Sequence, residues 1–227
     1  MKQRPALVIF ARAPLAGKTK TRLIPALGPS GAAELYEQFL LDTLSQAAGL
    51  PADVLVAAAD PSQAGAIQMA MARAGLEAPV IGQSGRDLGE RMANATGEAL
   101  ARGAAGAVVI GSDSPSLPPE RVASALSLLP ERDVVLGPCL DGGYYLIGQR
   151  RLLPELFQGV EWGGRDVLAQ TVRRARSIGA SVALLEPWYD VDTPEDLALL
   201  RSHLTALALA GAPIPCPRTW EFLHERA

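Results

Sequence analysis

Short apolar segments alternate with longer amphipathic segments along most of this 227-residue chain. Apolar runs too short for helices, bounded by turn residues, predict strands at 6–11, 53–59, 79–81, 106–110, 133–136, 144–147 and 181–185. The segments between and after them predict helices at 30–48, 62–74, 87–102, 118–129, 166–177 and 194–209. Strands that are apolar on both faces and separated by helices favour a mainly parallel sheet covered on both sides. We therefore expect an α/β fold with three α/β/α layers, and ligands beyond the carboxyl ends of the strands.

The composition limits the partners and the chemistry. A net charge of −3 and a pI near 5.5 give no general attraction to nucleic acid or to an anionic membrane. Two cysteines and no apolar run long enough to span a bilayer favour a cytoplasmic protein. With only two histidines, a multi-histidine zinc site is excluded, so carboxylates would hold any metal and would favour Mg²⁺ or Mn²⁺. We expect one domain over 1–210 with a proline-containing tail, 211–227, packed on it; the oligomeric state stays open.

The loop after the first expected strand contains Gly17-Lys18-Thr19, which is similar to the end of a nucleotide-binding P-loop. A true P-loop needs a glycine five positions before Gly17, and that position is Arg12. It also needs a helix that begins at the lysine, whereas prolines and a glycine follow at 25–29. A P-loop NTPase is therefore a poor fit.

The same loop still favours phosphate binding. It follows a strand in an acidic protein, concentrates basic side chains, and has a glycine that permits close backbone approach; the residues are Arg12, Gly17, Lys18, Lys20 and Arg22. Such a cluster at the carboxyl edge of a sheet suits a polyphosphate. A solvated basic loop is the alternative.

Carboxylates stand at three places where strands are expected to end. Asp113 follows the strand at 106–110 and is placed to hold a divalent cation, although an Asx turn or a helix cap also explains it. Asp141 precedes Gly142-Gly143, where a plain Asp-Gly turn is the alternative. Asp190 and Asp192 are two residues apart and face the same way if the chain is extended, so one of them facing Asp113 would complete a metal clamp.

Five motifs in this order resemble the GT-A-fold nucleotide-diphospho-sugar transferase superfamily over roughly residues 6–200. In particular the chain resembles a bacterial family of radical-SAM/selenodomain-associated, arsenosugar-biosynthesis glycosyltransferase-like proteins, whose first motif is PxxGxxKTRL. Phospholactate guanylyltransferase and molybdenum-cofactor nucleotidyltransferases are related to that family. The motifs here are PLAGKTKTRL (14–23), RDLGERM (86–92), GSDSP (111–115), GPCLDGGYYLIG (137–148) and DVDTPEDL (190–197).

The resemblance implies a role for each matched position. It implies catalytic roles for Lys18, Arg22, Asp113 and Asp141, and nucleotide or phosphate binding by Arg12, Gly17, Lys18, Arg22, Arg86 and Asp87. It implies substrate binding by Asp141, Gly142, Gly143, Tyr144 and Trp162, and metal binding by Asp113 with Asp190 or Asp192. For 86–91 an exposed amphipathic helix is the alternative. Where the family has Trp-Ser/Gly-Thr, this chain has Trp162-Gly163-Gly164-Arg165, so the hydroxyl is absent and Arg165 stands in its place or alters acceptor choice.

The implied activity is a metal-dependent transferase that uses a nucleotide or nucleotide-sugar donor and a small acceptor. The family resemblance favours glycosyl transfer first. The four basic residues of the first loop favour the alternative, nucleotidyl transfer with release of pyrophosphate. A nucleotide-sugar-binding protein without turnover is the third possibility, and it predicts nucleotide binding that is indifferent to Asp113→Ala.

Overall fold

A computed structural model describes residues 3–225, and its centre is a seven-stranded mixed sheet. The strand order is β3-β2-β1-β4-β6-β5-β7, and among these strands only β6 runs antiparallel to its neighbours. The expected mainly parallel sheet is therefore confirmed. The bounds are β1 Ala6–Ala11, β2 Asp53–Ala58, β3 Val80–Gly82, β4 Ala107–Ile110, β5 Val134–Pro138, β6 Tyr144–Gln149 and β7 Val182–Leu184.

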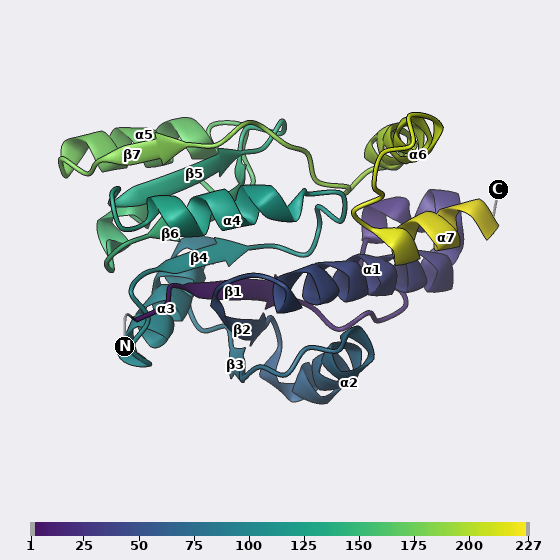
Figure 1. Ribbon diagram of the computed structural model, residues 1–227, viewed down its shortest axis with the longest axis horizontal. Helices are drawn as coiled ribbons and strands as arrows, with labels where there is room; N and C mark the ends of the chain where they lie inside the picture. Colours follow the sequence, from purple (N-terminus) through teal and green to yellow (C-terminus); the bar gives the residue numbers. More distant parts are fainter. Residues whose placement is uncertain (1–2, 226–227) are drawn as a thin grey trace.

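Helices cover both faces of the sheet, which gives the three expected layers (Figure 1). One apolar cluster joins β1, β2 and β4 to helices α1 (Ile24–Ala48), α2 (Ala64–Ala74) and α4 (Pro119–Leu128). A second cluster joins the other face to α3 (Leu88–Ala101), α5 (Val167–Ser177) and the 3-10 helix η3 (Pro154–Phe157). Two further short 3-10 helices, η1 (Thr21–Leu23) and η2 (Pro61–Gln63), precede α1 and α2. The alternation of side chains across each buried strand supplies both clusters.

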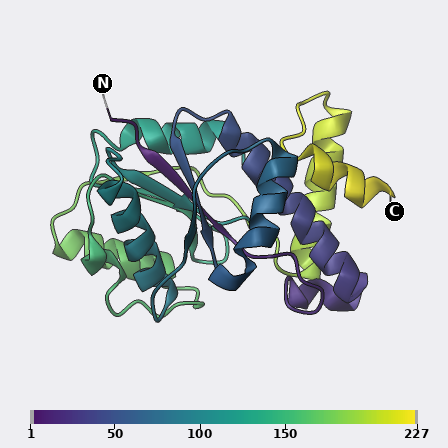
Figure 2. The same cartoon turned by 90° about the horizontal axis from the view of Figure 1, so that it is seen from below.

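A third apolar cluster lies beyond the sheet, where α6 (Pro194–Leu209) and α7 (Pro217–Glu225) pack beside α1 (Figure 2). Leu23 from the first loop and Val191 from the segment before α6 are fully buried in it. The cluster therefore anchors the two segments that carry the basic loop and the DVD motif. α7 lies within 211–227, and Asp42 of α1 accepts hydrogen bonds from Arg218 N and from Thr219 N and Oγ1 at its start.

A short helical segment precedes the helix that the sequence predicts from about residue 30. α1 is bounded by Ile24 and Ala48, and Pro25 lies in the first turn of its leading segment. Gly28 interrupts α1 with φ 71° and ψ 167°, a non-helical conformation that glycine adopts readily. The uninterrupted helix therefore begins after Gly28, close to the expected start, and a kink joins it to the leading segment. Among the described residues, no helix has both the length and the apolar character needed to cross a membrane.

Candidate active site

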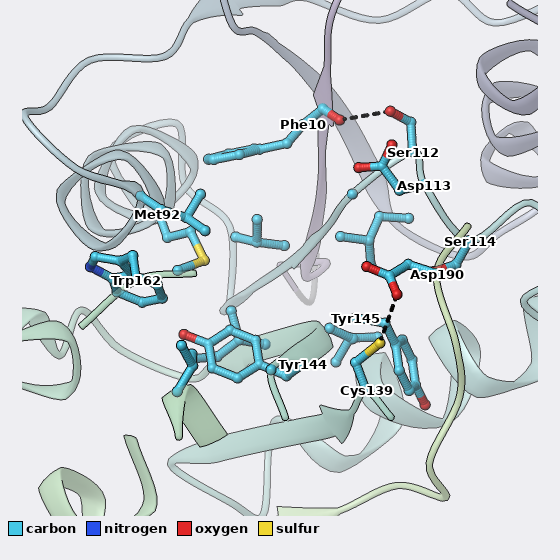
Figure 3. Close-up of a pocket in the computed structure, with 18 of the residues that line it drawn as sticks. Phe10, Met92, Ser112, Asp113, Ser114, Cys139, Tyr144, Tyr145, Trp162 and Asp190 are labelled. Carbon is cyan, nitrogen blue, oxygen red and sulfur yellow. Dashed lines mark hydrogen bonds between the residues drawn. The ribbon is translucent and has the colours of Figure 1, made fainter. Parts of the chain in front are cut away.

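A cavity of about 340 Å³ opens at the carboxyl ends of β1 and β4. It is the place where a mainly parallel sheet ordinarily binds ligands. Figure 3 shows Met92, Trp162 and Tyr144 on one side of this cavity and the carboxylates of Asp113 and Asp190 on the other. We call it the main cavity. Its walls combine an aromatic, apolar side with an acidic side.

A second cavity of about 350 Å³ lies around the first loop. The two cavities share Arg12, Tyr36 and Asp113, so these residues stand at the boundary between them. The second cavity is lined otherwise by 18–22 of the first loop and by Asp192. We call it the basic cavity.

Lys20 connects the first loop to Asp113 and Asp192, two of the carboxylates predicted to bind a metal. Its ammonium lies 2.6 Å from Asp113 Oδ1 and 2.7 Å from Asp192 Oδ1. The lysine side chain is only 4% exposed, whereas the carboxylate side chains are 47% and 42% exposed. Burial by itself would lower the pKa of the Lys20 ammonium, but the two carboxylates outweigh that effect and raise the pKa above its ordinary value.

Tyr36 of α1 holds the first loop against the loop that carries Asp113. Its hydroxyl accepts a hydrogen bond from Arg12 N (2.9 Å) and lies 2.7 Å from Ser112 Oγ, which in turn donates to Phe10 O (3.2 Å). Burial, reinforced by the charge of Asp113, raises the pKa of Tyr36 to about 12, so the hydroxyl stays protonated at neutral pH. Tyr36 is therefore a positioning residue at the joint of the two cavities.

Asp190 faces a different group from Asp192, although the two are only two residues apart. The Cys139 thiol donates to Asp190 Oδ1 over 3.3 Å, and Cys139, Asp141 and Asp190 each offer one ligand atom within 4.8 Å of the others. Burial, with the charges of Asp192 and Asp141 added, raises the pKa of Asp190 to about 6. Burial and the neighbouring carboxylates raise the pKa of Cys139 to about 12, which leaves its thiol protonated and a poor nucleophile.

The β5–β6 turn carries the predicted substrate residues and is held by its own contacts. Asp141 Oδ1 accepts a hydrogen bond from Gly143 N over 2.8 Å, as in an Asx turn. Gly142 has φ 95°, and a Cβ placed there would meet the backbone oxygen of Arg165 at 2.0 Å. This close approach comes from the chain's own 162–168 turn, since Leu168 N also donates to Gly142 O over 3.0 Å. The glycine is thus needed for packing between two turns that border the main cavity.

Trp162 and Tyr144 form the aromatic wall of the main cavity. Their rings lie edge to face with centroids 6.5 Å apart. Trp162 also packs against Gly89, where an added Cβ would meet the indole Cζ2 at 2.5 Å. The wall is therefore fixed from β6, from the 162–168 turn and from the start of α3.

The remaining predicted residues lie outside this tightly connected centre. The Arg86 side chain is 90% exposed and pairs with Glu90, while Asp87 caps α3 by accepting from Glu90 N over 2.8 Å. Lys18 and Arg22 line the basic cavity and are exposed. Gly17 has φ 77° with no atom near a virtual Cβ, so its backbone conformation alone favours glycine there.

Within the basic cluster predicted from the sequence, Lys18 and Arg22 carry individual phosphate-binding roles, whereas Lys20 was counted only as one of its four cations. The motif PxxGxxKTRL contained the missing information, because counting three residues from Gly17 places its lysine at Lys20. Tyr36 was also missed, and its helical position among apolar residues offered no functional pattern. The hard, all-oxygen donor set of Asp113 and Asp192, with each carboxylate partly exposed, fits Mg²⁺ or Mn²⁺.

A comparison with known protein families identifies the family to which this chain belongs. Residues 40–164, more than half of it, match the model of a family described as "uncharacterized protein conserved in bacteria" (DUF2064). The chain belongs to the DUF2064 family. The matched region contains the 86–92, 111–115 and 137–148 motifs and Trp162, whereas the basic loop and the DVD motif lie outside it. No curated protein matched the sequence.

One solved structure is similar to this chain over nearly the full length of both proteins. A candidate nucleotide-diphospho-sugar transferase from Desulfovibrio desulfuricans G20 is 35% identical with a TM-score of 0.87, and the match covers 97% of this chain and 94% of that one. CMP:2-keto-3-deoxy-manno-octonic acid synthetase with CTP is 16% identical with a TM-score of 0.57 and 89% and 99% coverage. 4-Diphosphocytidyl-2C-methyl-D-erythritol synthase from Anaerococcus prevotii DSM 20548 is 12% identical, with a TM-score of 0.60 and 89% and 96% coverage.

The last two similarities are similarities of fold. Together with the Desulfovibrio structure they confirm the expected GT-A-like fold and the resemblance to its superfamily. They also support the expectation of an enzyme of the GT-A transferase type in the DUF2064 family.

Proposed function

We propose that this protein is a divalent-metal-dependent nucleotidyltransferase that joins a nucleotide to a small phosphorylated acceptor and releases pyrophosphate. The observation that carries the proposal is the basic cavity, which lies across Asp113 from the main cavity and is lined by Arg12, Lys18 and Arg22. A nucleoside triphosphate has a free, strongly anionic end that needs space and cations of its own. The basic cavity supplies both.

The alternative donor has a different shape. In a nucleotide-diphospho-sugar the phosphates lie between two uncharged groups, so a glycosyltransferase needs no separate cationic pocket for a leaving pyrophosphate. The family resemblance favours glycosyl transfer first, whereas the division of the site into two cavities favours nucleotidyl transfer. Glycosyl transfer remains the second candidate because the 35% identical Desulfovibrio protein is described as a nucleotide-diphospho-sugar transferase.

The chemistry follows from this placement. An oxygen of the acceptor phosphate attacks the α-phosphorus, a new P–O bond forms, and the bond to the bridging oxygen of the β-phosphate breaks. Arg12, Lys18 and Arg22 then stabilise the charge that gathers on the departing pyrophosphate. Asp113 and Asp192 would hold the divalent cation, which neutralises charge on the phosphates when it is bound.

The main cavity is proposed to hold the nucleoside and the acceptor. Trp162 and Tyr144 offer flat apolar faces to a ring, and Asp141 offers a carboxylate to hydroxyl groups of a sugar or acid. Arg86 and Asp87 directly precede Leu88, which lines the main cavity, and we propose that they contact the outer part of the nucleotide.

The proposal is tested by the products. The protein is incubated with each nucleoside triphosphate, Mg²⁺ and a panel of sugar phosphates and phosphorylated acids, and pyrophosphate is measured. We expect acceptor-dependent pyrophosphate from one nucleotide. Release of a nucleoside diphosphate from nucleotide-sugars, without pyrophosphate from any triphosphate, would reject it in favour of glycosyl transfer.

A further inference from the structure

The buried ammonium of Lys20 lies where a cation would bridge the two carboxylates of the site. Its partners come from distant parts of the chain, Asp113 after β4 and Asp192 before α6, with distances of 2.6 and 2.7 Å. Lys20 has φ 49° and ψ 46°, and it is the one non-glycine residue with positive φ in the described part of the chain. Such a conformation is costly for a side-chain-bearing residue and persists when its surroundings fix it. The loop therefore holds the ammonium in this position at the expense of backbone strain.

The other cations of the loop behave differently. Within the described residues, Lys18 and Arg22 are exposed and form no ion pair with Asp113 or Asp192. The Lys20 ammonium instead lies 5.8 Å from the centroid of the Phe39 ring, over its face, as in a cation–π contact. The Lys20 ammonium therefore interacts with the two carboxylates and is largely shielded from solvent.

A divalent cation and this ammonium compete for the same oxygens. The Lys20 ammonium lies within hydrogen-bond distance of both Oδ1 atoms, so it already engages the oxygens that Asp113 and Asp192 would offer to a divalent cation. A doubly charged ion beside the ammonium would also be repelled strongly at this low exposure. The carboxylates themselves remain accessible at 47% and 42% exposure, so a cation can reach them.

We infer that Lys20 is a built-in counter-cation, which closes the Asp113–Asp192 pair in the free protein and has to leave it before a divalent cation binds there. The inference rests on the proposed function only in taking these two aspartates as the metal ligands. Lysine has a flexible four-carbon stem, and the basic cavity lies beside it. A phosphate group in that cavity would accept the displaced ammonium, so that donor and metal enter the site together.

The first test measures Mn²⁺ affinity without nucleotide, by the loss of the electron paramagnetic resonance signal of free Mn²⁺. Lys20→Met removes the competing charge, and we expect Mn²⁺ to bind at least about tenfold more tightly than to the wild type. Lys18→Met is the matched control, because it removes the same charge from the same loop, and its affinity should stay within about twofold of wild type. Unchanged or weaker binding in Lys20→Met, or an equal gain in Lys18→Met, would overturn the inference.

A second test uses the wild-type chain and avoids any loss of folding in the variant. The sequence has only three lysines, Lys2, Lys18 and Lys20, so lysine-selective ¹³C/¹⁵N labelling gives few side-chain resonances to assign. Titration with Mg²⁺ alone should shift the Lys20 signal saturably and leave the Lys18 signal in place. A Lys20 signal that does not move while Mg²⁺ binds would refute the displacement. Neither test measures turnover, so a failed pyrophosphate assay would reject the proposed reaction and leave this inference standing.

Discussion

Gly142→Ala should destabilise the protein more than Gly163→Ala, a substitution at a nearby glycine that also has positive φ. Gly142 has φ 95°, which costs a residue with a Cβ about 1 kcal/mol. The new Cβ would also lie 2.0 Å from the Arg165 carbonyl oxygen, so one of the two turns has to shift by more than an ångström. Overpacking of this kind costs about 2 kcal/mol more, giving about 3 kcal/mol together.

The chain contains its own control in Gly163. This residue has φ 84°, but nothing lies within 4 Å of a Cβ added there. Gly163→Ala should therefore show only the backbone term, about 1 kcal/mol. For a domain of this size, the two variants should lower the thermal midpoint by about 6–12 °C and about 2–4 °C respectively.

The assay is urea and thermal unfolding of both variants followed by circular dichroism. The difference between them isolates the contact between the Gly142 turn and the Arg165 backbone. Equal losses of stability in the two variants would refute the packing argument. Such a result would favour the substrate-binding role that the sequence predicts for Gly142.

Further predictions concern the tail, the acidic cluster and the rim. Asp42→Ala leaves three donors at the start of α7 without their acceptor and should cost about 2–3 kcal/mol in urea unfolding, against no loss if α7 docks by apolar contacts alone. The Asp190 carboxyl of the metal-free protein should titrate near pH 6 by ¹³C NMR; because its pKa is raised on folding, it contributes stability at low pH that is lost as pH rises from about 4 through 6, and a pKa near 4 would contradict this. Arg86→Ala should raise the KM for the nucleotide and leave the thermal midpoint unchanged, and a shifted midpoint with an unchanged KM would make Arg86 structural. Asp113→Asn should lower the Mg²⁺-dependent rate at least about a hundredfold, and a rate independent of this change would exclude the carboxylate from the reaction.

The layers and most elements could be predicted because they depend on local patterns. Buried strands such as β1 and β4 are continuous apolar runs, and Thr193 with Asp196 forms the capping box at the start of α6 that the Thr-Pro-Glu-Asp sequence favours. The short segment of α1 before Gly28 could not be predicted, since a glycine and two prolines can either delay a helix or kink it. In the structure Leu23, just before this segment, is buried in the third apolar cluster.

The centre of the site depends on long-range contacts: the PxxGxxKTRL motif singles out Lys20 but not its partners. Lys20 meets Asp192 across 172 positions of sequence, and only the completed fold shows which of the four basic side chains in the loop is buried. Asp190 accepts a hydrogen bond from the Cys139 thiol, whereas Asp192 pairs with Lys20. The backbone N–H of Asp192 also donates to Asp196 in the first turn of α6. The motif order indicated which loops meet, whereas the contacts within them required the structure.

Pyrophosphate release from nucleoside triphosphates, with Mg²⁺ and phosphorylated acceptors, decides between the two candidate reactions. We expect pyrophosphate in equal amount to a nucleotide-linked product, strict dependence on acceptor, and loss of both in Asp113→Asn. Formation of a nucleoside diphosphate and a glycosylated acceptor from a nucleotide-sugar, with no pyrophosphate from any triphosphate, would contradict this expectation.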